Sequence, residues 1–214
     1  MNESLAIAVF AAGGAAFGLI ADRLSVRWPA HEADYQPRGL DWRTLVLAVA
    51  GGVVFGALPA RWSDLNSLVI LGVYCAALLV LLATDLDQKL LPDLISLPLI
   101  CYSGILLVAG LSPLLAGKDL GLASGIAAGI AAPLFLFVTD RLLGGDLGDG
   151  DLKLAVSIGL MSGISQLILG LLIASIGFSA VLLVLMAMRR IGMRTAVPFG
   201  PVLIAAGFVA VLLG

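Results

Sequence analysis

The chain has 214 residues, of which 61% are hydrophobic and 12% are charged, and its mean hydropathy is +1.12. A soluble domain contains about 45–50% apolar and about 25% charged residues. The composition therefore excludes a compact soluble enzyme and a disordered chain, and it predicts a polytopic membrane protein. The formal net charge of −2 gives no electrostatic support to a nucleic-acid partner.

Apolar stretches recur along the chain, and a stretch of roughly 17–25 residues crosses a hydrocarbon core. Six approach that length: residues 5–21, 44–58, 68–83, 94–111, 120–138 and 197–213. Residues 164–188 are long enough to cross with tilt, whereas residues 152–162 are too short to cross alone. We therefore predict an all-α bundle forming one domain, residues 1–214, with about eight transmembrane segments and a short or broken sixth helix.

The longest polar connection, residues 23–42, follows the first stretch. It holds no cysteine, and His31 is its only histidine, whereas a structural zinc site needs about four N or S ligands. The two cysteines of the chain, Cys75 and Cys101, lie in apolar stretches. We therefore expect no metal, no cofactor and no disulfide framework.

Basic residues predict the orientation, because cytoplasmic loops carry an excess of Lys and Arg. With eight crossings, only Arg61 and Lys118 fall on one side. The other side holds Arg23, Arg27, Arg38, Arg43, Lys89, Arg141, Lys153, Arg189, Arg190 and Arg194. We therefore predict that this second side is cytoplasmic and that both termini are non-cytoplasmic.

Small residues recur at four-residue spacing, which allows helices to approach closely in a membrane. The positions are Gly14 and Gly18, Gly52 and Gly56, and the series Gly121, Gly125 and Gly129. Packing within the bundle explains all of them, and a homo-oligomer formed through these faces is the alternative.

Half of the fourteen acidic residues fall in two short segments on the predicted cytoplasmic side, and all of these are Asp. They are Asp85, Asp87 and Asp93 in the first segment, and Asp140, Asp146, Asp149 and Asp151 in the second. Asp85 ends the third predicted helix and Asp151 opens the sixth. Ionisable groups at the border of hydrocarbon are costly, so both are functional candidates.

The second acidic segment is rich in glycine, which lets the backbone bend sharply and approach a neighbour. Gly148 and Gly150 directly precede Asp151, and we expect both to be intolerant of a side chain that would displace it. If Asp85 and Asp151 come into contact, they cannot both ionise, and the pair shares one proton. The ionised member can then take a proton from water while the protonated member polarises a carbonyl. This is the chemistry of an aspartic protease.

Three motifs occur in an order that resembles the bacterial prepilin peptidases, which are membrane aspartic proteases of the GxGD type. The first is DLDQKLLPD at residues 85–93, and the second is GDGDLK at residues 148–153. The third is Pro198-Phe199-Gly200-Pro201 at the start of the last apolar stretch. The resemblance covers residues 65–214.

The resemblance implies that Asp85 and Asp151 form the catalytic pair. It makes Gly148, Gly150, Asp93, Lys153, Pro198, Phe199, Gly200 and Pro201 supporting motif residues. It further implies a multi-pass protein of the bacterial cytoplasmic membrane that cuts short basic leaders from type IV prepilins or pseudopilins on the cytoplasmic side. Larger family members carry a cysteine-rich domain, linked to N-methylation, where this chain has residues 23–42. Since these residues lack cysteine, methyltransferase activity is in doubt.

The remaining acids have two interpretations. Asp87, Asp146 and Asp149 form an acidic surface that attracts the basic leader, or they are solvated loop residues. Asp93 precedes an apolar stretch and is also suited to cap the fourth helix. A calcium loop of the EF-hand type is excluded because Asp149-Gly150-Asp151 lacks the required spacing and the distant Glu.

Two functions of other classes compete with the protease. A proton- or cation-coupled transporter would use Asp85 and Asp151 as a relay, but such transporters often show two related halves, and none is found here. The other is an inactive secretion-system assembly factor, which the presence of both Asp residues argues against.

Overall fold

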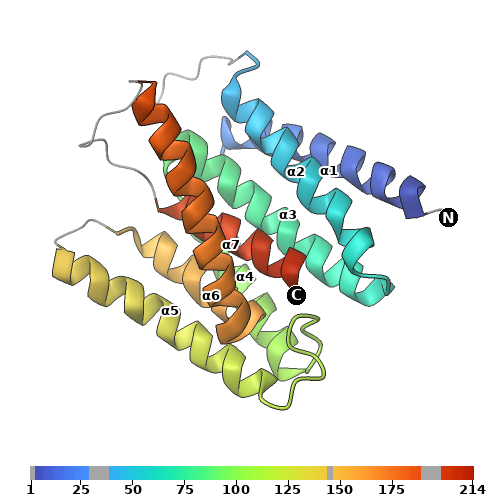
Figure 1. The fold of residues 1–214 in the computed structure, drawn as a ribbon, viewed down its shortest axis with the longest axis vertical. Coiled ribbons are helices and arrows are strands. Elements are labelled where there is room, and N and C mark those ends of the chain that lie inside the picture. The colour runs from blue at the N-terminus through green and yellow to red at the C-terminus, as the bar shows by residue number, and fades with distance from the viewer. Residues whose placement is uncertain (1–2, 29–38, 144–146, 189–198) are drawn as a thin grey trace.

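The computed structural model describes residues 3–28, 39–143, 147–188 and 199–214. In these ranges the protein is helical and has no strand, which confirms the all-α class. The helices are α1 (Glu3–Ser25), α2 (Trp42–Arg61), α3 (Leu65–Gln88), α4 (Asp93–Val108), α5 (Gly121–Leu143), α6 (Asp149–Ala187) and α7 (Gly200–Leu213). Figure 1 shows them packed as one bundle.

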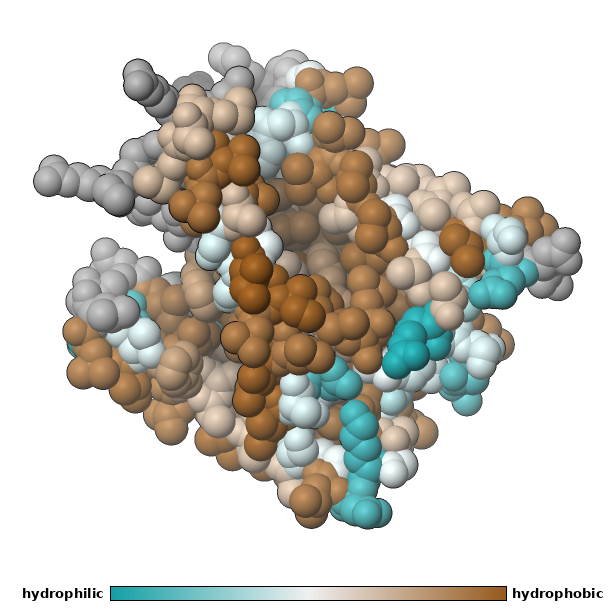
Figure 2. Space-filling view, in the orientation of Figure 1, coloured by the Kyte–Doolittle hydropathy of each residue, from teal (hydrophilic) through white to brown (hydrophobic). Residues whose placement is uncertain are grey.

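Five of these helices, α1, α2, α3, α5 and α6, are long and apolar enough to cross a membrane. The other two, α4 and α7, are apolar but have only 16 and 14 residues. Large apolar side chains such as Leu65, Leu94 and Phe135 are exposed on the outer surface. Figure 2 shows such side chains over much of the visible face. The chain is therefore a multi-pass membrane protein whose outer surface suits lipid.

Helices α1 and α2 form a tight antiparallel pair because glycines leave room for backbone contact. A Cβ on Gly14 would stand 2.2 Å from the carbonyl oxygen of Gly51, and a Cβ on Gly51 would stand 2.2 Å from that of Gly14. A Cβ on Gly18 would stand 2.2 Å from the carbonyl oxygen of Leu47. The small residues of this pair therefore serve helix packing inside one chain.

The end of α2, the start of α1 and the end of α7 lie close together at one end of the bundle. Trp62 Nε1 donates to the carbonyl oxygen of Val211 at 3.2 Å, and Arg61 Nη2 donates to that of Gly214 at 3.0 Å. The start of α1 lies at the same end, since a Cβ on Gly56 would meet the Cβ of Ala11 at 2.9 Å. Figure 1 shows that α3 ends, and that α6 and α7 begin, at the opposite end of the bundle.

Helix α6 is broken at Gly163, where φ is 69° and ψ is 178°. The backbone N–H of Ile164 is freed from the helix and donates to Ser124 Oγ of α5 at 3.0 Å. The stretches predicted as separate sixth and seventh segments, 152–162 and 164–188, thus form one helical element with a break between two arms. Figure 1 shows that the two arms run in different directions.

Several element ends differ from the sequence prediction. Helix α3 continues past residue 83 to Gln88, so Asp85 lies within its last turn rather than at its end. Helix α4 stops at Val108 rather than at residue 111, because Gly110 adopts φ 67° and turns the chain. In the predicted loop 23–42, residues 23–25 belong to α1, and His31 lies outside the described residues.

Candidate active site

Asp85 is buried in the last turn of α3, with 5% of its surface exposed. The helix ends just beyond it, where Lys89 adopts a left-handed conformation with φ 53° and its N–H donates to the Asp85 carbonyl oxygen at 2.9 Å. The side-chain atom Oδ2 is buried and has no hydrogen-bond partner among the described residues. An unsatisfied buried carboxyl oxygen is costly in a structural position, so Asp85 remains a candidate functional residue.

Gly200, the first residue of α7, lies directly against this carboxyl group. A Cβ at this position would stand 2.6 Å from Asp85 Oδ2 and 2.9 Å from Cγ, so only glycine permits the approach. The start of a helix carries a partial positive charge. The α7 N-terminus therefore lies where it favours negative charge on Asp85.

Asp151 lies in the first turn of α6 and is partly exposed. Its backbone N–H donates to the Gly148 carbonyl oxygen at 3.0 Å, which forms the turn that opens the helix. Asp85 and Asp151 interact electrostatically. The backbones of α3 and α6 do not approach each other closely, whereas α7 packs against both. The two carboxyls are thus electrostatically coupled across helices that are held together through α7.

Two further contacts join the first and second sequence motifs. A Cβ on Gly150 would stand 2.7 Å from Leu91 Cβ and 3.3 Å from the Leu91 carbonyl oxygen, so α6 begins against the α3–α4 connection. Lys153 Nζ pairs with Asp93 Oδ1 at 2.5 Å, linking α6 to α4. The expectation that Asp93 caps α4 is wrong: Pro92 occupies the cap position without a side-chain hydrogen bond, and the Asp93 carboxylate reaches across to Lys153 instead.

The other acids have distinct surroundings. Arg43 Nη1 donates to Asp87 Oδ1 at 2.6 Å, and the Asp87 side chain is only 8% exposed. Asp140 Oδ1 accepts a hydrogen bond from the Leu147 N–H at 2.9 Å, which ties the end of α5 to the glycine-rich segment. Asp149 is exposed at the start of α6. Asp146 lies outside the described residues.

The third motif is described only from Phe199 onward, and Pro198 lies outside the described residues. Phe199 precedes α7 and is partly buried against the hydrophobic core. Pro201 follows in the first turn of α7, where a missing N–H is tolerated. The motif thus starts α7 and brings Gly200 to Asp85.

For three residues whose contacts are described above, the sequence predicts no individual role: Arg43, Leu91 and Asp140. Leu91 lies inside the first motif and Asp140 belongs to the second acidic segment, so both stand in segments that the motif and charge patterns single out. For Arg43 the sequence shows only a basic residue near a predicted membrane border, and the predicted orientation in the membrane already explains such a residue.

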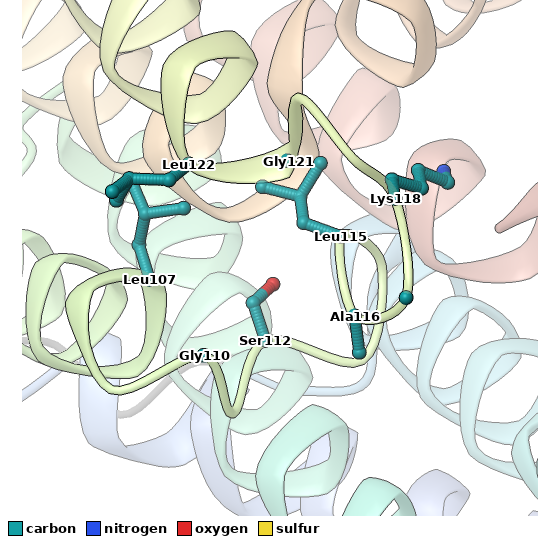
Figure 3. Close-up of a pocket in the computed structure, with 9 residues that line it drawn as sticks. Leu107, Gly110, Ser112, Leu115, Ala116, Lys118, Gly121 and Leu122 are labelled. Atoms are coloured by element: carbon teal, nitrogen blue, oxygen red, sulfur yellow. The ribbon is translucent and has the colours of Figure 1, made fainter.

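A cavity of about 170 Å³ lies at the α4–α5 connection, between Leu107, Ser112, Leu115 and Lys118 (Figure 3). It is separate from the Asp pair, because the 16 residues of α4, roughly 24 Å, separate Asp93 from this connection. The described residues contain no group of three or more His, Cys, Asp or Glu side chains that could hold a metal ion.

Comparisons with known proteins support the resemblance. Residues 72–185, more than half of the chain, match the type IV leader peptidase family. A protein of Burkholderia pseudomallei named prepilin leader peptidase/N-methyltransferase is 34% identical over 175 residues, covering 79% of this chain and 54% of the relative. Relatives of the same name from Pseudomonas putida and Aeromonas salmonicida are 34% and 33% identical, covering 90% and 79% of this chain and 60% and 56% of the relative, respectively.

The chain therefore spans little more than half the length of these relatives. No solved structure matches it. The family match includes Asp85 and Asp151 together with the first two motifs. The chain belongs to the type IV leader peptidase family.

Proposed function

We propose that the chain is a membrane aspartic endopeptidase that removes the short basic leader from type IV prepilins or pseudopilins. The observation that carries this proposal is the placement of Asp85: buried under Gly200, without a hydrogen-bond partner for Oδ2 among the described residues, and electrostatically coupled to Asp151. Membership of the type IV leader peptidase family supports the same activity, and it does not favour the transporter or the assembly factor.

The proposed reaction uses one proton shared by Asp85 and Asp151. The ionised carboxylate takes a proton from a water molecule as the water oxygen attacks the carbonyl carbon of the scissile peptide bond. The protonated carboxyl gives its proton to the carbonyl oxygen, which forms a neutral tetrahedral intermediate. The carboxyl that took the water proton then gives it to the peptide nitrogen, while the other carboxylate takes a proton from one hydroxyl group of the intermediate. The C–N bond breaks, which releases the leader carboxyl group and the new amino terminus and leaves one proton on the pair.

The proposed topology has eight crossings, with the two arms of α6 counted separately. The break at Gly163 and the placement of the two termini at the end opposite Asp85 support this arrangement. The excess of basic residues in the connections next to both Asp residues supports their location at the cytoplasmic face of a bacterial inner membrane. Basic leaders of prepilins would reach them from that side.

The proposal is restricted to peptide-bond cleavage. The relatives carry the name prepilin leader peptidase/N-methyltransferase, but this chain spans little more than half of their length. The connection between α1 and α2 contains no cysteine. Methyl transfer is therefore not part of the proposed activity. The mass of the cleaved product shows directly whether a methyl group has been added.

The test is cleavage of a prepilin-like substrate with a basic leader, a Gly and a hydrophobic segment, reconstituted with the purified protein in detergent. Wild type is compared with Asp85→Asn and Asp151→Asn. Asp119→Asn is the matched control, because Asp119 is exposed near the start of α5, far from the site. Mass spectrometry of the products identifies the cleaved bond and any added methyl group.

We expect cleavage by wild type and Asp119→Asn, and loss of cleavage in both site variants at normal expression. Cleavage that survives either Asp85→Asn or Asp151→Asn would end the dyad assignment. A wild-type protein that cuts none of a panel of prepilin and pseudopilin substrates would contradict the peptidase itself.

A further inference from the structure

The ion pair between Arg43 and Asp87 joins the first turn of α2 to the last turn of α3. The Arg43 Nη1 to Asp87 Oδ1 distance is 2.6 Å, and the side chains are 29% and 8% exposed. Asp87 follows Asp85 by two residues. Such a partly buried, charge-assisted hydrogen bond holds its partners in a fixed geometry, and removal of either partner breaks this connection between α2 and α3.

A second contact fixes the same turn of α3 from the side of α1. Gln88 Nε2 donates to the carbonyl oxygen of Ser25, the last residue of α1, at 2.6 Å. The α3 turn carrying Asp85 is therefore held by α2 through Asp87 and by α1 through Gln88. The left-handed Lys89 ends the helix directly after these contacts.

The α1–α2 pair is itself rigidly connected at this end. Thr44 Oγ1 donates to Asp22 Oδ2 at 2.9 Å, and Asp22 is fully buried in α1. Asp41 caps α2 by accepting hydrogen bonds from the backbone N–H groups of Arg43 and Thr44. Since the glycine contacts also lock α1 against α2, Arg43 projects from a fixed support.

The position of Asp85 depends on this support because few contacts fix its carboxyl group directly. Residues two apart on an α-helix point about 200° apart, so Asp85 and Asp87 lie on opposite sides of α3. Asp85 lies against Gly200 of α7, and its Oδ2 has no hydrogen-bond partner among the described residues. The orientation of the last turn of α3 therefore sets where the Asp85 carboxyl lies relative to Asp151.

We propose that Arg43 is a positioning residue: through Asp87 it makes the α1–α2 pair the support that holds Asp85 in its reactive place. This inference rests on the proposed peptidase function. It gives a role to helices that lie outside residues 72–185, the segment that matches the family. It also assigns Asp87 to the support rather than to the acidic surface for the leader.

The experiment compares wild type with Arg43→Gln, Asp87→Asn, the double variant and Arg43→Lys in the prepilin cleavage assay. Values of kcat and KM are determined per folded molecule, and thermal unfolding in detergent is measured in parallel. Arg141→Gln is the matched control, since Arg141 is an exposed cation in the last turn of α5 at the same end of the bundle.

We expect each single variant to lower kcat by about tenfold to a hundredfold, because a small displacement of a reacting group has effects of that size. KM should stay near the wild-type value, and Arg141→Gln should behave as wild type. The double variant should be no worse than either single variant, since both residues act as one unit. Arg43→Lys should retain part of the activity.

Three results would overturn the inference: a wild-type kcat in folded Arg43→Gln, a change confined to KM, or additive losses in the double variant. If the single variants do not accumulate, the double variant removes both charges of the pair and provides the same test, with a wild-type kcat as the contrary result. Failure of wild type to cleave any substrate would instead overturn the peptidase function, which separates the two failures.

Discussion

The carboxyl group of Asp85 lies against the backbone of Gly200, at a distance that admits no side chain on the glycine. A Cβ there would stand 2.6 Å from Oδ2 and 3.1 Å from Oδ1. The contact joins the first motif to the third across 115 residues of sequence. It explains in physical terms why a glycine begins α7 beside a buried carboxyl.

Substitution of Gly200 by alanine tests this contact. The new methyl group would force the Asp85 carboxyl to rotate away, because the clash is with the end of a short side chain rather than with backbone. We expect kcat to fall by about a hundredfold, with a melting temperature close to wild type. Gly177→Ala is the control, since a Cβ at Gly177 meets nothing within 4 Å. A Gly200→Ala variant with wild-type kcat would show that Asp85 need not occupy this position.

The two glycines before Asp151 should differ in their tolerance of a side chain. A Cβ on Gly150 would stand 2.7 Å from Leu91 Cβ, whereas a Cβ on Gly148 meets nothing closer than 3.9 Å. We therefore expect Gly150→Ala to lower cleavage strongly by separating α6 from the α3–α4 connection, and Gly148→Ala to remain close to wild type, which corrects the sequence-based expectation that neither position tolerates a side chain. Cleavage rates of the two variants, normalised to folded protein, decide between this expectation and equal intolerance at both positions.

The break in α6 depends on the hydroxyl group of Ser124. Its Oγ accepts the Ile164 N–H at 3.0 Å, and Ser124→Ala would leave this N–H without its partner. We expect the free energy of unfolding to fall by about 0.5–1.5 kcal/mol, the net contribution of one hydrogen bond. Unfolding in detergent measures the loss, with Ser165→Ala as control because Ser165 is exposed on the other side of the break. Equal stability of the two variants would contradict this role of Ser124.

Asp149 is the remaining described candidate for attraction of a basic leader. It is exposed in the first turn of α6, two residues before Asp151. We expect Asp149→Asn to raise KM by roughly twofold to fivefold, the effect of one exposed ion pair, and the difference from wild type to shrink at high salt. A substrate with a neutral leader is the control and should not distinguish the two proteins. A KM that changes neither with the substitution nor with the ionic strength would contradict the hypothesis that Asp149 forms part of an acidic surface for the leader.

Much of the fold and the candidate dyad could be predicted from the sequence, because hydrocarbon constrains the chain so strongly. Apolar stretches must be helical in a membrane, so composition and length predicted the all-α bundle. The gap left at Gly163 between two predicted stretches coincides with the break in α6. Asp85 and Asp151 stood out because carboxyls are costly at a membrane border, and the motif order indicated the family that the comparisons then showed.

Only the tertiary structure decided which side chains meet. The contacts of Gly200 with Asp85, Gly150 with Leu91, and Arg43 with Asp87 each join residues far apart in the chain. Their partners depend on how whole helices rotate and cross, and helix periodicity does not determine this in a bundle that is apolar on all sides. Asp93 shows the same limit: its place before an apolar stretch indicated a cap, but Lys153 of another helix is its partner. The sequence determined which residues are costly in a membrane, and the packing of helices decided what those residues contact.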